Sequence, residues 1–192
     1  MIFMIRIFSI LMIFLLVSCN GLTILDFYSA YKGFQSNKSD EIKITDEFID
    51  NQRFSFIDFR FNGYQLIMPL LSVKGSELTW ISADGIEVVT KNGKIIKINN
   101  SDFDFYSVNL DFNCSDGANF TYDIFFSNPF MFESQSSVID VVDEICFENV
   151  YSHGLKSNFK NIYKFDSEGQ LFYSNQFIRS DISEFEINFY LK

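Results

Sequence analysis

Apolar and polar residues alternate along most of the chain beyond residue 41, and this period of two is typical of β-strands with one buried face. The segment 183–192 shows the pattern most clearly. Its apolar positions are Phe185, Ile187, Phe189 and Leu191, and its polar positions are Glu184, Glu186, Asn188 and Tyr190. The pattern predicts a last strand that covers a core with one face only.

Turn dipeptides between the β-rich segments predict hairpins. In 53–71, two arms flank Asn62-Gly63, and Asn-Gly favours the two-residue type I′ turn of a hairpin. Residues 78–98 hold three short β-rich pieces around Asp84-Gly85 and Asn92-Gly93. We expect both of these dipeptides to form type I′-like turns, so that consecutive strands pair antiparallel.

Two later regions extend the sheet. The pattern in 137–154 predicts one long strand, and 158–180 predicts a hairpin that turns near Glu168-Gly169. A sheet this large has to curl or fold on itself to hide its apolar face and its edges. We therefore expect an all-β fold, in which a large antiparallel meander sheet forms an open barrel or sandwich in a single domain over 41–192.

The start of the chain has the pattern of a bacterial lipoprotein signal. Arg6 precedes an apolar run over 7–17, which is shorter than the roughly 20 residues of a membrane-spanning helix. The run ends in a lipobox, Leu16-Val17-Ser18-Cys19, where a small residue precedes a cysteine. We expect 1–18 to be a signal peptide and Cys19 to carry an N-acyl diacylglycerol with palmitate-like chains, which together hold a protein stably on a bilayer. The alternatives are an uncleaved anchor and an ordinary signal peptide.

A tether is expected to follow over 19–40. The spacing of Leu22, Leu25, Tyr28 and Tyr31 predicts a short amphipathic helix within 22–34, before a polar loop. Asn20 follows the cysteine, where an aspartate would signal retention at the inner membrane. We therefore expect the periplasmic face of the outer membrane in a cell with two membranes.

Charge narrows the range of partners. The chain of 192 residues has a net charge of −10, from 15 basic and 25 acidic residues. Removing the signal would take away one arginine and no acid, so the remaining chain is more acidic still. Nucleic acid and anionic lipid head groups are polyanions and are disfavoured as partners. Basic partner proteins are favoured over an anionic polymer.

Two cysteines remain after Cys19. Cys114 and Cys146 form either a disulfide, as an oxidising compartment allows, or two buried thiols. A bridge would close a loop of about 32 residues and contribute roughly 3–4 kcal/mol in the chain-entropy model. Zinc is not expected, because the chain has one histidine, His153, and no CxxC.

Catalytic and metal-binding patterns are weak in this sequence. A Ser-His-Asp triad would need His153, which lies in a polar stretch. The acidic pairs Asp102/Asp104, Asp140/Asp143 and Glu184/Glu186 could serve glycan hydrolysis, but their spacing also fits a solvated strand face. The acids of 101–117 lack calcium-loop spacing. We expect no cofactor, no metal and no catalytic residue.

The segment "WISADGIEVVTKNGKIIK" resembles the pattern of the YjbF/GfcB family of lipoproteins, which is associated with group 4 capsule and exopolysaccharide secretion. The matching positions are Trp80, Asp84, Gly85, Asn92 and Gly93. The order of lipobox, helix and strands elsewhere agrees, whereas 101–135 matches poorly. The resemblance implies a meander sheet folded on itself and an export role, and it transfers no catalytic residue. Trp80 is expected in the core, with stacking on a sugar ring as the alternative.

Three functions remain open from the sequence. The leading one is a non-enzymatic outer-membrane lipoprotein, attached to the membrane by its lipid, that is an accessory of capsule or exopolysaccharide export or assembly. The second is a periplasmic carrier that binds a lipid or hydrophobic ligand inside an open β-barrel. The third is an enzyme that acts on glycan.

Overall fold

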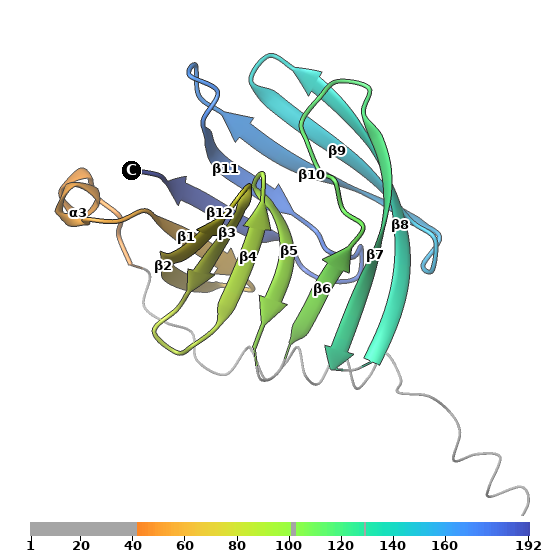
Figure 1. Cartoon of the computed structure of the whole chain (residues 1–192), viewed down its shortest axis with the longest axis horizontal. Helices are drawn as coiled ribbons and strands as arrows, with labels where there is room; N and C mark the ends of the chain where they lie inside the picture. The colour runs from red at the N-terminus through yellow and green to blue at the C-terminus, as the bar shows by residue number, and fades with distance from the viewer. Residues whose placement is uncertain (1–41, 101–102, 129) are drawn as a thin grey trace, which may run out of the picture.

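The computed structural model describes residues 42–100, 103–128 and 130–192. These residues form one short helix and twelve β-strands (Figure 1). The elements are α3 (Asp46–Asn51), β1 (Phe56–Phe61), β2 (Tyr64–Lys74), β3 (Glu77–Ile81), β4 (Glu87–Lys91), β5 (Lys94–Asn99), β6 (Asp104–Val108), β7 (Asn119–Asn128), β8 (Phe130–Val142), β9 (Ile145–Ser152), β10 (Ser157–Phe165), β11 (Leu171–Gln176) and β12 (Phe185–Tyr190). The predicted lipobox and the predicted helix within 22–34 lie outside the described residues.

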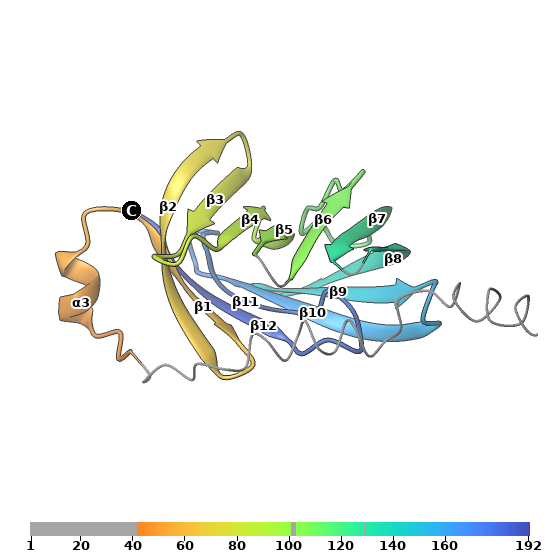
Figure 2. The same ribbon diagram turned by 90° about the horizontal axis from the view of Figure 1, so that it is seen from below.

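Each strand pairs antiparallel with its neighbours in the sequence, and β1 pairs with β12 to close the ring. The predicted antiparallel meander is confirmed, and the pairing of its first and last strands makes it a closed barrel. The closing register runs from Phe56 opposite Tyr190 to Phe61 opposite Phe185. Figure 2 shows that the barrel is flattened, with β1 and β9 to β12 in one layer and β3 to β8 facing them.

Two of the predicted type I′ turns have the expected backbone. Asn62 and Gly63 have φ angles of 52° and 78°, and Asn92 and Gly93 have 50° and 86°. Both central residues of a type I′ turn need a positive φ, which glycine adopts freely and asparagine tolerates. Asn-Gly therefore joins β1 to β2 and β4 to β5 with two-residue turns.

The expected type I′ turn at Asp84-Gly85 is wrong. Only Gly85 has a positive φ, of 81°, and the β3–β4 connection is a longer turn over 82–86. The N–H of Gly85 donates to the Ser82 carbonyl at 3.0 Å, and the N–H of Ser82 donates to the Ile86 carbonyl at 2.9 Å. The larger loop lets the glycine sit at its end, so the aspartate does not need the left-handed conformation.

The hairpin predicted near Glu168-Gly169 is confirmed, and its turn has the same hydrogen bonds. The N–H of Gly169 donates to the Asp166 carbonyl, and the N–H of Asp166 donates to the Gln170 carbonyl, both at 2.9 Å. Gly169 supplies the positive φ, of 79°. The two turns with aspartate or glutamate before glycine thus share one conformation, which differs from that of the Asn-Gly turns.

The single long strand expected over 137–154 is also wrong. The chain reverses at Asp143-Glu144, between β8 and β9, and Asp143 has a φ of 54°. Aspartate tolerates the left-handed region, so the turn forms without a glycine. Valine and isoleucine on both sides of the acidic pair made the two strands look continuous in the sequence.

Helix α3 was not predicted. It lies outside the barrel, next to the end of the chain (Figure 1). Thr45 caps it, because its hydroxyl oxygen accepts from the Phe48 N–H at 3.2 Å. At the other end, the Lys192 ammonium donates to the Ile49 carbonyl at 2.8 Å and also to the Gln52 carbonyl. A cation at the C-terminal end of a helix is favourable, so the end of the chain fixes α3 beside β12.

Aromatic side chains fill the part of the barrel interior next to β1 and β12. Phe61 stacks on Phe185 with 4.2 Å between ring centroids. Trp80 is fully buried, and its indole N–H donates to the Thr90 hydroxyl at 3.0 Å. A buried indole cannot stack on a sugar from solution, so Trp80 is a core residue.

The Gly93 turn gives a first prediction. A Cβ on Gly93 would lie 2.1 Å from Leu171 Cδ2, whereas a Cβ on Gly75, whose φ is 62°, would meet no atom within 4 Å. We expect Gly75→Ala to cost about 1 kcal/mol of unfolding free energy from backbone strain. Gly93→Ala should cost about 2 kcal/mol, because the added methyl group also has to displace the terminal methyl groups of Leu171, a flexible side chain.

Urea unfolding followed by Trp80 fluorescence measures both costs. Equal destabilisation by the two substitutions would contradict the close contact between Gly93 and Leu171.

Candidate functional site

A group of polar side chains, here called the interior cluster, is buried inside the barrel. Its members are Lys94 on β5, Tyr122 on β7, Ser137 on β8, Glu148 on β9, and Asn161 and Tyr163 on β10. None of these residues is more than 4% exposed. The cluster occupies the side of the interior away from the aromatic residues of β1 and β12.

Glu148 is the centre of the interior cluster. One carboxylate oxygen accepts from the Ser137 hydroxyl at 2.7 Å and forms an ion pair with Lys94. The other accepts from the Asn161 amide and from the Tyr163 hydroxyl, each at 2.9 Å. Lys94 also donates to the Tyr122 hydroxyl oxygen at 2.9 Å. A buried charge needs such a complete set of partners, and here both ions have one.

Burial and charge shift the proton affinities of this cluster. Burial alone would raise the pKa of Glu148, but the Lys94 charge and the surrounding donors outweigh it and lower that pKa. Burial lowers the pKa of Lys94, against the opposing effect of Glu148. Burial and the Glu148 charge raise the pKa of Tyr122 and Tyr163 well above the ordinary value. Both tyrosines are therefore neutral hydrogen-bond donors.

The interior cluster is closed to substrates. The cavity beside it, lined by Lys94, Tyr122, Gln135 and Gln176 among others, has a volume of about 10 Å³. Such a space holds about one water molecule at most. Within the described part of the chain, no buried side-chain polar atom of the cluster lacks a hydrogen-bond partner. The cluster is consequently a polar part of the core, despite having the residue types of an acid-base site.

Gln176 on β11 connects the two facing layers of the barrel. Its amide nitrogen donates to the Gly93 carbonyl at 2.7 Å, and its amide oxygen accepts from the Ile95 N–H at 2.9 Å. The side chain thus bonds to the β5 backbone as a paired strand would. This contact holds β5 against β11 and closes the barrel interior at the end where β4 turns into β5.

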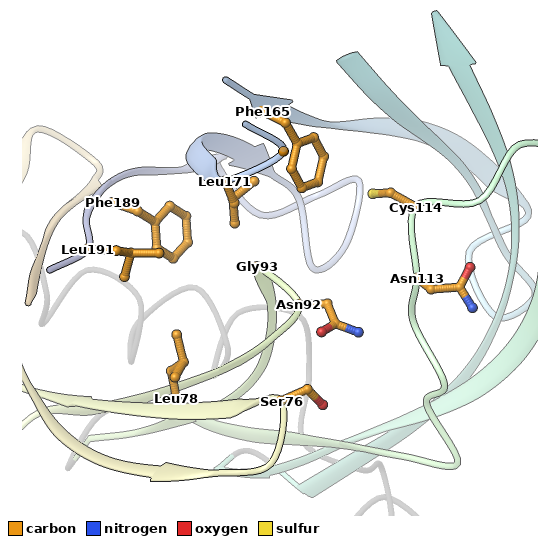
Figure 3. Close-up of a pocket in the computed structure, with 11 residues that line it drawn as sticks. Ser76, Leu78, Asn92, Gly93, Asn113, Cys114, Phe165, Leu171, Phe189 and Leu191 are labelled. Atoms are coloured by element: carbon orange, nitrogen blue, oxygen red, sulfur yellow. The ribbon is translucent and has the colours of Figure 1, made fainter. Parts of the chain in front are cut away.

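A larger hollow lies beyond this contact, at the end of the barrel where β4 turns into β5 and β10 into β11 (Figure 3). We call it the mouth pocket, and its volume is about 400 Å³. It is lined by Ser76, Leu78, Asn92, Gly93, Asn113, Cys114, Phe165, Gly169, Leu171, Phe189 and Leu191. Figure 3 shows Phe189, Leu191, Leu171 and Phe165 along one side and Leu78 and Ser76 across from them. Its size is that of small-molecule sites.

A second hollow of about 370 Å³ adjoins the mouth pocket and shares Cys114, Phe165 and Gly169 with it. We call it the acidic hollow, because Asp143, Glu144 and Asp166 line it. The mouth pocket itself has no charged side chain among its lining residues. An apolar space and an acidic space therefore lie next to each other at one end of the barrel.

The cysteines left open by the sequence are joined in a disulfide, with 5.8 Å between their Cα atoms. The bond attaches the β6–β7 loop to β9, so that the loop forms a wall of both hollows. Phe112, on the same loop, is fully buried and packs on Tyr163 with 4.7 Å between ring centroids. The ring thus packs against the interior cluster, and the Lys94 ammonium lies 5.5 Å from its centroid.

The residues of the family pattern are not gathered at one site. Asn92 and Gly93 line the mouth pocket, and the Asn92 amide donates to the Phe112 carbonyl at 2.7 Å. Asp84 and Gly85 belong to the β3–β4 turn, which is at the opposite end of the barrel. Trp80 lies in the core between them. Their spacing along the sequence reflects strand and turn geometry.

The candidate chemical residues of the sequence lie on the outer surface. His153 is exposed and its Nε2 is 2.7 Å from the Ser136 hydroxyl. Asp140 accepts from the Asn149 amide at 2.6 Å, and Glu184 accepts from the Asn175 amide at 3.0 Å. Asp102, the partner named for Asp104, lies outside the described residues.

Residues 42–100, 103–128 and 130–192 contain neither a metal-binding group nor a membrane-spanning helix. There, no three His, Cys, Asp or Glu side chains come together in a way that could hold a metal ion. Among the same residues, no helix combines the length and the apolar composition needed to cross a membrane.

Sequence reasoning missed the interior cluster. The available signal was the period of two in β9, where Cys146, Glu148 and Val150 share the buried face. A glutamate between two buried residues of a strand points inward and needs a partner. Its cation, Lys94, is 54 residues away in the sequence, so no local pattern could identify it.

Comparison with known proteins gives a likeness of fold. No family model matches the chain, and no curated protein sequence matches it. Among solved structures, it is similar to the crystal structure of the hypothetical lipoprotein YmcC from Escherichia coli K12, with a TM-score of 0.68 and 20% identity. The match covers 90% of this chain and 98% of that one. The barrel architecture is therefore shared over nearly the whole of YmcC.

The ion pair predicts a large effect of removing one partner. Lys94→Met should lower the unfolding free energy by about 3–5 kcal/mol, because it leaves a buried carboxylate without its cation. Adding Glu148→Gln should recover part of this loss, since a neutral amide needs no counter-ion. Urea unfolding measures both variants.

The matched control is Lys97→Met. Lys97 pairs with Glu87 at 2.6 Å, but its side chain is 39% exposed, and such pairs contribute about 1 kcal/mol or less. Equal costs for the Lys94 and Lys97 substitutions would contradict the role of burial.

Acid should remove the contribution of Glu148. Its pKa is lower in the folded protein than the ordinary value of 4.5, so the carboxylate stabilises the fold above that pH. The stabilisation is lost as the pH falls through the folded-state pKa. We expect the stability difference between wild type and Glu148→Gln to be constant near neutral pH and to shrink at more acidic pH. Urea unfolding over a pH series tests this, and a difference that persists in strong acid would contradict it.

Proposed function

We propose that this protein is a non-enzymatic lipoprotein of the outer membrane that acts as an accessory in the export or assembly of a capsule or exopolysaccharide. The observation that carries the proposal is the combination of two features. A lipobox ends at Cys19, and the barrel that follows has the architecture of YmcC, which is itself named a lipoprotein. The lipobox supports a lipid anchor, and the likeness to YmcC supports a lipoprotein barrel as the domain that the anchor carries.

The anchor places the barrel at a membrane surface. Several acyl chains on Cys19 contribute about 0.8 kcal/mol for each buried methylene, which is sufficient for stable attachment. Asn20 favours delivery to the outer membrane over retention at the inner one. The barrel is then held on the periplasmic side by the tether over 19–40.

The distribution of polar groups supports a binding or assembly role over catalysis. Glu148 and Lys94 have the chemistry of an acid-base pair, but they are sealed in the core beside a cavity of about 10 Å³. Asp140 and Glu184 accept hydrogen bonds from neighbouring amides on the outer surface. An inverting or retaining glycosidase needs two carboxyl groups facing each other across a cleft. Asp143, Glu144 and Asp166 do share the acidic hollow, but the Asp166 carboxylate already accepts from the Glu168 and Gln170 N–H groups of its own turn.

The packed interior also argues against a carrier that holds a lipid or hydrophobic ligand inside the barrel. An acyl chain does not fit into the small space beside Lys94, and Trp80, Phe105 and Phe126 fill the other side of the core.

The segment "WISADGIEVVTKNGKIIK" supports the connection with polysaccharide through its resemblance to the YjbF/GfcB pattern. The acidic net charge favours a basic surface on an export protein as the partner.

The proposal predicts a loss of secreted and surface polysaccharide in a strain that lacks the gene. Wild-type protein should restore the polymer, and Cys19→Ala should not, because it cannot be acylated. Labelling with radioactive palmitate and membrane fractionation would check that the variant is made but not anchored.

Unchanged amount and chain length of the polymer in the deletion strain would overturn the accessory role. Release of new reducing ends from the polymer by the purified protein would instead identify an enzyme. Full restoration by Cys19→Ala would contradict the need for the anchor.

A further inference from the structure

We infer that the mouth pocket and the acidic hollow together bind an amphiphile that has an apolar chain and a positively charged head group. This inference rests on the geometry of the barrel end and is independent of the polysaccharide role. The interior of the barrel is filled, so the site is at its end and differs from the internal site of a carrier barrel.

The mouth pocket provides the apolar part of the site. Leu78 on β3 faces Leu171 on β11 and Phe189 on β12 across the hollow, and Leu191 continues the same wall (Figure 3). Leu78, Leu171 and Leu191 remain half-exposed around a hollow of about 400 Å³, whereas Phe189 is buried. The three leucines therefore offer apolar surface that a ligand can cover. Burial of each further methylene there would tighten binding about fourfold.

The acidic hollow determines the charge of the head group. Asp143, Glu144 and Asp166 lie on the β8–β9 and β10–β11 turns, which meet beside Phe165. A chain that fills the mouth pocket past Phe165 and Gly169 brings its head to these three acids. A carboxylate or phosphate head would be repelled there, whereas an ammonium group would be attracted.

Basic side chains near this end do not cancel the acidic field. Lys91, on the strand before the Asn92-Gly93 turn, donates to the Leu110 carbonyl at 2.9 Å and lies 3.8 Å from an Asp111 carboxylate oxygen. Lys94 is buried against Glu148. Lys91 and Lys94 are therefore already engaged with acceptors of the protein. Lys164, next to Phe165, has its ammonium 4.8 Å from the centroid of the Tyr173 ring and is engaged there.

The walls of the site are fixed before a ligand binds. The disulfide holds the loop at Cys114 to β9, and the Phe165 N–H donates to the Glu144 carbonyl at 2.9 Å. On the opposite wall, the side chain of Asn92 is bonded to the Phe112 carbonyl. A preformed site loses little conformational entropy on binding, which favours affinity for a small ligand.

Titration calorimetry with three ligands of equal chain length tests the inference. Octylamine, octanol and octanoate share a chain that stays monomeric at the concentrations needed, and at neutral pH they carry a cationic, a neutral and an anionic head. We expect octylamine to bind at least about tenfold more tightly than octanoate, with octanol between them. Amide chemical shift changes should centre on Leu78, Gly169 and Leu171.

Two sets of variants separate the chain and the head. Leu78→Trp places a larger side chain in the mouth pocket, into which residue 78 points (Figure 3), and should abolish binding of all three ligands, whereas Asn158→Trp on an exposed part of β10 should leave it unchanged. The triple variant Asp143→Asn, Glu144→Gln, Asp166→Asn should remove the preference for octylamine while octanol binding persists. Asparagine tolerates the positive φ of residue 143 and can accept the hydrogen bonds made by Asp166, so the turns are preserved.

The matched charge control is Asp123→Asn, Glu184→Gln, Glu186→Gln, which removes the same charge elsewhere and should keep the preference. Equal affinity for the three head groups, or a preference that survives the first triple variant, would overturn the assignment of the head. Absence of binding at millimolar ligand, or binding that survives Leu78→Trp, would overturn the site. None of these results depends on whether polysaccharide export changes in a deletion strain.

Discussion

The pairing of β1 with β12 is the constraint on which the rest of the molecule depends. It joins the two ends of a meander that would otherwise expose two sheet edges with free N–H and C=O groups. The aromatic residues at both ends of the seam reinforce it, since Phe56 stacks on Tyr190 at 4.6 Å and Phe61 stacks on Phe185 at 4.2 Å. Closing the ring brings the end of β12 beside the turns of β4–β5 and β10–β11, and only then does the mouth pocket exist.

Inside the ring, polar and apolar groups are separated by strand. Phenylalanines of β1, β6 and β12 pack on one side, and Glu148 with its partners from β5, β8 and β10 occupies the other. A shift of β9 by one residue would turn Glu148 to the outer surface and leave Lys94 buried without an anion. The interior cluster thus favours one register among the longest strands, where hydrophobic packing alone distinguishes registers less sharply.

Much of the fold could be predicted from the sequence, because its signals are local. The alternation in β12 and the Asn-Gly turns depend on residues that are adjacent or two apart, and both were found where expected. The β8–β9 turn was missed because Asp143-Glu144 has no glycine and is flanked by β-branched residues. Helix α3 was missed because six residues are too few to show a helical period.

The candidate sites could not be predicted in the same way. Lys94 meets Glu148 across 54 residues, and the mouth pocket is assembled from six separate segments between Ser76 and Leu191. Such groups become neighbours only through the closure and the flattening of the barrel, which single-sequence patterns do not specify. The cysteine pair differed, because only Cys114 and Cys146 remained to form a disulfide after Cys19. The sequence could not show that the two lie close together in space, so a disulfide and two buried thiols both stayed open.

The position of the disulfide relative to the seam has a consequence for how the molecule comes apart. The bond encloses β7 and β8, which lie on the far side of the ring from β1 and β12. If the ring opens at the seam, the disulfide keeps the ends of the enclosed hairpin together. A partly opened molecule carries two complementary edges that fit the edges of another opened copy as well as their own. Exchange of terminal strands between copies thus requires only that the seam opens, and it does not require complete unfolding of the chain.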